Sequence, residues 1–295
     1  MELFASQLLN GCALGSLYAL FGIGFGLVFA TMGILNAAQG CYATWAAIIG
    51  LAAAEQLGLP FPLVVLSAIA GGAIVGTAVD QLGFQPLRAR RADMLGALIT
   101  SIAFWMILDS LAGFATGQQS LSFPAASYPN RMLLTEPVPL PAMQLISIGA
   151  LIVVTIAMHW MIVHTRVGAA IRAVGWNPVA AALGGVNSRN IILLTAALSG
   201  AISGIAGAMG GILSSNVSFT LGQGLMLKGF AAVVVGGYTD VRGTAIAGIA
   251  LGILEVFCAQ YISTALRDGF TYTLLLLFLL LRPQGLFGSR GFVRA

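Results

Sequence analysis

Ionisable side chains are rare in this chain, and three of them lie inside long apolar stretches. Asp109, Lys228 and Glu255 are surrounded by hydrophobic residues, and Lys228 is the only lysine. A charge at the centre of a membrane helix costs roughly 2.5 to 3.5 kcal/mol even by low estimates, so such a residue usually has a partner or a function. Lys228 and Glu255 could form an ion pair, which would lower the burial cost of both. The pair could be a structural clamp, or it could take part directly in a substrate path.

Residues for covalent or metal chemistry are few. The two histidines, His159 and His164, accompany neither an HExxH motif nor a pair of neighbouring cysteines, so we expect no metal site. Ser199 and Ser203 precede glycines but lack the GxSG pattern of an intramembrane protease. The only lysine is followed by glycine and therefore cannot complete a Walker A motif. We expect no catalytic residues and no enzymatic activity in this chain.

The composition predicts an integral membrane protein. Hydrophobic residues make up 59% of the chain and charged residues only 7%, far below the roughly 25% of soluble domains. Apolar runs long enough to cross a bilayer recur throughout. The fold class that we expect is all-α: one polytopic transmembrane helical bundle over residues 1–295, with about 8–9 spans and a broken or re-entrant segment. The predicted spans are residues 7–29, 40–57, 62–82, 94–115, 143–164, 190–213, 224–238, 243–261 and 269–281.

Arginines indicate which ends of these spans face the cytoplasm, because short loops rich in arginine remain on that side. Nine of the twelve gather in two loops and in the carboxyl-terminal tail: Arg88, Arg90 and Arg91; Arg166, Arg172 and Arg189; Arg282, Arg290 and Arg294. The proline-rich loop at about 116–142 is then expected on the outer face. In this arrangement Lys228 is expected near the outer end of its span, and the amino terminus is outside if the first three spans all cross.

The interruption between the first two spans contains two polar residues. Asn36 and Gln39 lie between Gly33 and Gly40. The segment could be a cytoplasmic turn or a re-entrant break, and a break within the bilayer requires protein or a water-filled cavity to satisfy its amides.

Glycine occurs 38 times, often at a spacing of four residues, as at Gly11 with Gly15 and Gly248 with Gly252. Such pairs allow helix backbones to approach closely, and we expect packing within the chain rather than a subunit interface. Gly236 and Gly237 interrupt the short span that contains Lys228. They could act as a pivot or serve only packing.

The second basic loop, at about 165–189, predicts a short capped helix. Asn177 can cap its amino terminus, Pro178 fits the first turn, and Gly184 with Gly185 can end it. A rigid helix of this kind suits docking to a partner, although an ordinary ordered loop is the alternative.

The chain resembles the permeases of branched-chain amino-acid ABC importers, of the LivH/LivM type and closer to LivH. Four segments carry the resemblance: GIGFGLVFATMGILNAAQG, TRVGAAIRAVGWNPVAAALGGVN, LKGFAAVVVGGYTDVRGTAIAGIALGILE and RPQGLFG. The resemblance implies a multi-pass protein of the bacterial inner membrane. It also implies four kinds of partner: a second permease of the LivM type, two ATPases of the LivG and LivF type, a periplasmic substrate-binding protein and the lipid bilayer. It implies no cofactor in this chain, because ATP binds the partner ATPases.

The resemblance also implies roles for particular residues. The element from Asn177 to Gly185 would dock on an ATPase. The residues expected in this coupling region are Arg172, Asn177, Pro178, Ala181 and Gly184. The residues expected in the translocation path or its gate are Asn36, Gln39, Lys228, Gly236, Gly237 and Glu255.

The sequence departs from the usual family pattern at Ala37 and Gln39, where phenylalanine and histidine are common. This difference leaves urea and short amides open as substrates beside amino acids. A gradient-driven secondary transporter and a purely structural membrane subunit are the alternatives outside the family.

Overall fold

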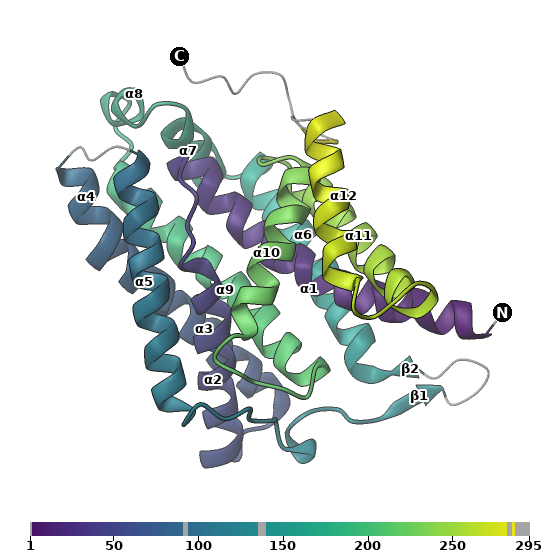
Figure 1. Ribbon diagram of the computed structural model, residues 1–295. Coiled ribbons are helices and arrows are strands. Elements are labelled where there is room, and N and C mark those ends of the chain that lie inside the picture. The colour runs from purple at the N-terminus through teal and green to yellow at the C-terminus, as the bar shows by residue number, and fades with distance from the viewer. Residues whose placement is uncertain (1, 91–93, 135–139, 282–284, 287–295) are drawn as a thin grey trace.

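The computed structural model describes residues 2–90, 94–134, 140–281 and 285–286, and it is mainly helical (Figure 1). The α-helices in chain order are α1 (Glu2–Met32), α2 (Gln39–Gln56), α3 (Phe61–Val79), α4 (Gln85–Ala89), α5 (Met94–Ala115), α6 (Ala142–His164), α7 (Arg166–Trp176), α8 (Pro178–Leu183), α9 (Ser188–Leu213), α10 (Leu221–Gly236), α11 (Val241–Tyr261) and α12 (Arg267–Leu281). A π-helix, η1 (Asp80–Phe84), joins α3 to α4, and a 3-10 turn, η2 (Ala125–Ser127), follows α5.

Two short strands, which the sequence did not predict, lie between α5 and α6. β1 (Met132–Leu134) pairs antiparallel with β2 (Leu140–Pro141). Prolines in this loop disfavour a helix and leave extended backbone, whose amides are satisfied by pairing.

Six helical segments within the described residues are long and apolar enough to cross a membrane: α1, the continuous segment Phe61–Ala89, α5, α6, α9 and α11. The predicted boundaries agree closely with the helices, since α5 is Met94–Ala115 as expected and α6 begins one residue early. The other three predicted spans are also helical, as α2, α10 and α12. α10 is a shorter apolar helix.

α1 is the central helix. In an apolar 18-residue stretch of α1, 83% of the residues are buried, compared with 11% in α5 and 17% in α6. α1 contacts α6, α9, α10 and α11, whereas α5 and α6 carry many exposed leucines, isoleucines and valines. Exposed apolar faces on spanning helices are expected to contact lipid or another subunit.

Glycines bring the central helices into close contact, as predicted. A Cβ at Gly252 of α11 would lie 2.3 Å from the Cα of Gly15 in α1, and a Cβ at Gly200 of α9 would lie 2.1 Å from the carbonyl oxygen of Gly72 in α3. A side chain at either position would separate the helices. The prediction that these glycines serve packing within the chain is therefore confirmed.

The basic loops lie together. α4, α7 and α8 occupy one end of the molecule, and β1 and β2 lie at the other (Figure 1). Arg88, in the last turn of α4, is anchored by both oxygens of buried Asp80, at 2.7 and 3.0 Å. Several predicted features lie outside the described residues: Arg91, Arg282, Arg290 and Arg294, and Pro137 and Pro139 of the outer loop.

Candidate translocation and coupling sites

The predicted ion pair is present, at the centre of a larger charged cluster. Lys228 of α10 places its Nζ 2.6 Å from Glu255 Oε1 of α11 and 2.9 Å from Asp268 Oδ1 of α12. Arg267, at the start of α12, donates from Nε to the same Glu255 oxygen. The Tyr18 hydroxyl of α1 donates to Glu255 at 3.1 Å and accepts from Lys228 at 3.3 Å. We call these five residues the charged cluster.

Burial explains why the cluster has so many members. Glu255 is 0% exposed and Lys228 is 8% exposed. An isolated buried carboxylate would pay a large desolvation penalty, which two cations and a hydroxyl offset here. Among the buried side-chain atoms of these five residues, Glu255 Oε2 alone has no hydrogen-bond partner in the described part of the chain. The four charges sum to zero, so the cluster fixes α10, α11 and α12 to α1 without a net buried charge.

The predicted position of Lys228 near the outer end of its span differs from the structure. α10 begins at Leu221, three residues before the predicted start of the span, so Lys228 is the eighth of sixteen residues and lies near the middle of the helix. Contact with α2 stabilises this first turn of α10, because the Gly222 amide donates to the Thr44 hydroxyl at 3.0 Å. Asp109, on α5, is half-buried and does not join the charged cluster.

The break between α1 and α2 lies within the helix bundle. The backbone of Gly33 has a φ of 68°, and buried Asn36 organises the residues that follow. Asn36 Oδ1 accepts from the Ala38 amide at 3.1 Å, while its Nδ2 donates to the Tyr42 hydroxyl at 2.8 Å. The Ala37 amide donates to Ser101 of α5 at 3.2 Å. Asn36 and Ser101 thus accept hydrogen bonds from backbone amides that have no partner within a helix, as a break inside a helix bundle requires.

Gln39 points toward the middle of the bundle. It is fully buried, and its Nε2 donates to Ser203 of α9 at 3.3 Å. The same nitrogen lies 3.3 Å from the position of a Cβ built on Gly24, well inside α1. Gln39 Oε1 has no partner among the described residues. Whether the segment between α1 and α2 is a cytoplasmic turn or a re-entrant break within the bilayer stays a prediction.

α10 connects the break to the charged cluster. Its first turn contacts the start of α2, where a Cβ on Gly222 would lie 1.9 Å from the carbonyl oxygen of Gly40, so no side chain fits at Gly222. Six residues later, about 9 Å along the helix, Lys228 enters the charged cluster. Four predicted path residues lie on α10 or on helices that it contacts: Gln39, Lys228, Gly236 and Glu255. Asn36 lies in the break just before α2, and Gly237 directly follows α10.

The second basic loop forms the predicted capped helix. Asn177 Oδ1 accepts from the amides of Val179 and Ala180 at 2.9 and 3.0 Å, and Pro178 occupies the first turn. The Gly184 amide donates to the Ala180 carbonyl at 3.1 Å, and the helix then ends. α8 is consequently a rigid, short helix at one end of the molecule.

The exposed face of α8 does not include Ala181, which we expected in the coupling region. Ala181 is only 7% exposed and packs against Val174 of α7 and Ile192 of α9. Val179 and Leu183 are 69% and 88% exposed. Their spacing of four places both on the outward face of the helix, a periodicity that the sequence already contained. Any partner of α8 would contact Val179 and Leu183, while Ala181 holds the helix in place.

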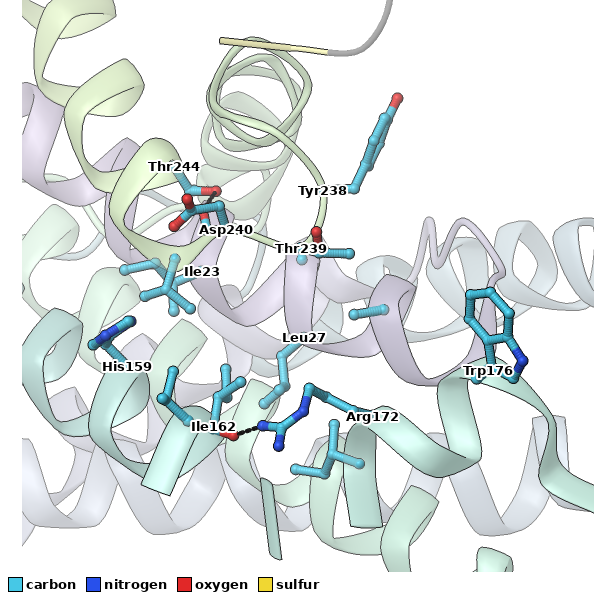
Figure 2. A pocket seen from close by; sticks show the side chains of 15 residues that line it. Ile23, Leu27, His159, Ile162, Arg172, Trp176, Tyr238, Thr239, Asp240 and Thr244 are labelled. Atoms are coloured by element: carbon cyan, nitrogen blue, oxygen red, sulfur yellow. Dashed lines mark hydrogen bonds between the residues drawn. The ribbon is translucent and has the colours of Figure 1, made fainter. Parts of the chain in front are cut away.

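A cavity of about 670 Å³ separates α7 from the turn between α10 and α11 (Figure 2). Ile23 and Leu27 of α1 form part of its apolar wall, and His159 lines it from α6 and contacts Arg242. Arg172 extends from α7 into this region and donates to the Ile162 carbonyl near the end of α6. Arg172 therefore secures the α6–α7 connection.

The turn between α10 and α11, on the other side of this cavity, requires glycine at two positions. Gly237 has a φ of 110°, a conformation that side chains disfavour. A Cβ on Gly236 would lie 2.4 Å from the backbone of Gly243 and Thr244. Asp240 caps α11 by accepting from the Arg242 amide at 2.9 Å. Packing and backbone conformation thus account for both glycines, and a pivot remains a prediction.

The model of the family described as branched-chain amino acid transport system, permease component, matches residues 7–279. The chain belongs to this family. It is 29% identical to the high-affinity branched-chain amino acid transport system permease protein BraD of Pseudomonas aeruginosa, over 97% of this chain and 96% of BraD. It is 28% identical to LivH of Escherichia coli strain K12 over the same shares of the two chains.

A local similarity extends to a sugar permease. The ribose import permease protein RbsC of Escherichia coli strain K12 is 34% identical over 109 residues, 35% of this chain and 34% of RbsC. The predicted family is confirmed, and the chain is a multi-pass helical membrane protein.

Proposed function

We propose that this chain is one membrane subunit of an ATP-driven importer for branched-chain or related amino acids in the bacterial inner membrane. The observation that carries the proposal is the full-length similarity to LivH and BraD, whose names describe high-affinity branched-chain amino acid transport. The whole chain, residues 1–295, would act as one permease domain of eight to nine spans, with its amino terminus outside and the 165–189 loop in the cytoplasm.

ATP would bind to separate ATPase subunits. Lys228, the only lysine, is buried in ion pairs and cannot contact a nucleotide phosphate from that position. The free energy for transport would therefore have to enter through a contact with the ATPases. α8 is suited to this contact, because its caps make it rigid and Val179 and Leu183 leave an apolar face uncovered.

Movement at α8 would reach the membrane through α7. Ala181 and Val174 join α8 to α7, and α7 borders the cavity beside the Gly236–Gly237 turn. Displacement of α7 would change the space into which that turn can move. A change between two arrangements requires that the ATPases bind one of them more tightly than the other.

The translocation path would lie along α10, between this chain and a second permease of the LivM type. Asn36 and Gln39 would contribute polar groups to it, since Gln39 keeps an unpartnered buried oxygen. Lys228 and Glu255 are better suited to a clamp, because their charges are already paired within the chain. A periplasmic binding protein would deliver substrate to the outer face.

Affinity purification of the tagged chain in mild detergent tests this assembly. We expect two ATPases and a second permease to co-purify, and we expect reconstituted vesicles to hydrolyse ATP faster when a loaded binding protein is added. Stimulation by urea- or amide-loaded binding protein, without stimulation by branched-chain amino acids, would change the substrate class. A chain that purifies without an ATPase and transports along an ion gradient would contradict the proposal.

A further inference from the structure

A second cavity, of about 340 Å³, has a mixed lining in which polar side chains gather beside apolar ones. Four carboxamide side chains converge on it from three helices: Gln7 and Asn10 from α1, Gln144 from α6 and Gln260 from α11. Arg267, a member of the charged cluster, completes the polar lining. Intramembrane polar groups are costly, and those that face a cavity commonly mark a substrate pathway.

The carboxamides form a connected chain of hydrogen bonds. Gln144 Nε2 donates to Asn10 Oδ1 at 2.6 Å, Asn10 donates to Gln7 at 3.3 Å, and Gln7 donates to Gln260 at 3.2 Å. Gln144 Oε1 remains without a partner among the described residues. Packing alone does not require such a chain, because leucine would fill the same positions in an apolar bundle without unsatisfied polar atoms.

We propose that this cavity binds one α-amino acid. Arg267 is 37% exposed at its side chain and carries five N–H donors, so it can hold a carboxylate while Nε binds Glu255. The carboxamide oxygens of Gln7, Asn10 and Gln260 keep a second lone pair each and provide acceptors for the ammonium group. Leu14, Leu213 and Val256 line the same cavity and provide apolar surface for an aliphatic side chain. A cavity of this volume is within the usual range for small-molecule sites.

The position of the cavity fits entry of the ligand from outside. It lies between the first turns of α1 and α6 and the last turns of α9 and α11, at the opposite end of these helices from α7. The site deepens the importer function proposed above and rests on it: it is the first place in this chain where a delivered amino acid would bind. Because Arg267 belongs to both, a bound carboxylate would share the Arg267 guanidinium with Glu255 of the charged cluster.

Thiol labelling tests the site without ATP. Thr264 lines the cavity and is exposed, so Thr264→Cys can react with a membrane-impermeant maleimide in the assembled importer in nanodiscs. The unaltered chain, with its own cysteines, sets the background. At ten times its dissociation constant, L-leucine should slow labelling about tenfold by occupancy. Leucinamide, which lacks the carboxylate, should protect much less.

Matched variants decide whether the carboxamides bind the ligand. Protection by L-leucine should be lost in Thr264→Cys combined with Gln144→Leu or with Gln260→Leu, and kept with Gln56→Leu, an exposed glutamine of α2 outside the cavity. Full protection in both cavity variants, equal protection by leucinamide, or protection only by acetamide or urea would overturn the site. If uptake proved independent of ATP while protection persisted, the proposed importer function would fail and the site would stand.

Discussion

The charged cluster and α8 differ in whether their side chains find partners inside the chain. In the charged cluster every ion finds a partner inside the chain, although the members come from α1, α10, α11 and α12. In α8 the backbone is fully capped, but Val179 and Leu183 stay uncovered. A region whose partners are internal supports stability, whereas a rigid region with uncovered apolar side chains supports docking.

Substitutions in the charged cluster and on α8 should therefore have different consequences. A lost partner in the charged cluster leaves a charge unpaired within the bundle and should destabilise the chain itself. A changed outward residue on α8 should leave the fold intact and weaken only the contact with another subunit.

Replacement of Glu255 by leucine should have the largest effect. Glu255→Leu removes the acceptor shared by Lys228, Arg267 and Tyr18, and breaking a buried pair costs about 3–5 kcal/mol. Thermal unfolding in detergent should show a large drop in midpoint. The control is Asp109→Leu, at an acid outside the charged cluster, which should change the midpoint little. Equal losses in the two variants would remove the distinction between clustered and isolated acids.

Replacement of Leu183 by aspartate should separate docking from folding. Leu183→Asp should weaken ATPase association by at least about 2 kcal/mol, on the order of thirty-fold, because a charge would replace an apolar contact. Co-purified ATPase measures this loss, and the unfolding midpoint should not move. Leu57→Asp, at an exposed leucine after α2, is the matched control and should retain the ATPase. Loss of the co-purified ATPase in both Leu183→Asp and Leu57→Asp would count against α8 as the docking element.

Replacement of Gly237 by alanine tests the turn beside the cavity of Figure 2. At a φ of 110° a side chain adds strain of about 1–3 kcal/mol. The unfolding midpoint should fall by an intermediate amount, and ATP-driven uptake should fall with it. Gly224→Ala is the control, because a Cβ at Gly224 meets open space. Normal stability with lost uptake would instead favour a pivot.

Removal of the helix cap should have the smallest effect. Asn177→Ala deletes the acceptor of two amides and should destabilise α8 by about 1 kcal/mol. We expect a modest fall in uptake with an unchanged global midpoint. Asn177→Asp should retain the cap and normal uptake. If the alanine variant transported normally, rigidity of α8 would not matter for coupling.

Local patterns predicted the features that depend on neighbouring residues. Hydropathy gave the bounds of α5, and the Asn177–Pro178 pair gave the start of α8. The Lys228–Glu255 pair was also predictable, because each residue is costly to bury alone.

Features that depend on helix packing could not be predicted in the same way. Tyr18 meets Glu255 across 237 positions of sequence, so only the contact between α1 and α11 brings them together. Arg267 was not predicted as a path residue, because it falls between the predicted spans 243–261 and 269–281, whereas the structure places it at the start of α12. The convergence of four carboxamides likewise depends on how α1, α6 and α11 rotate against one another.

The most direct test of the central claim is uptake into proteoliposomes that contain the purified assembly, with ATP inside, loaded binding protein outside and no ion gradient. We predict accumulation of a branched-chain amino acid that requires ATP hydrolysis and is lost with Leu183→Asp. Accumulation without ATP, driven by an imposed proton or sodium gradient through this chain alone, would contradict the account.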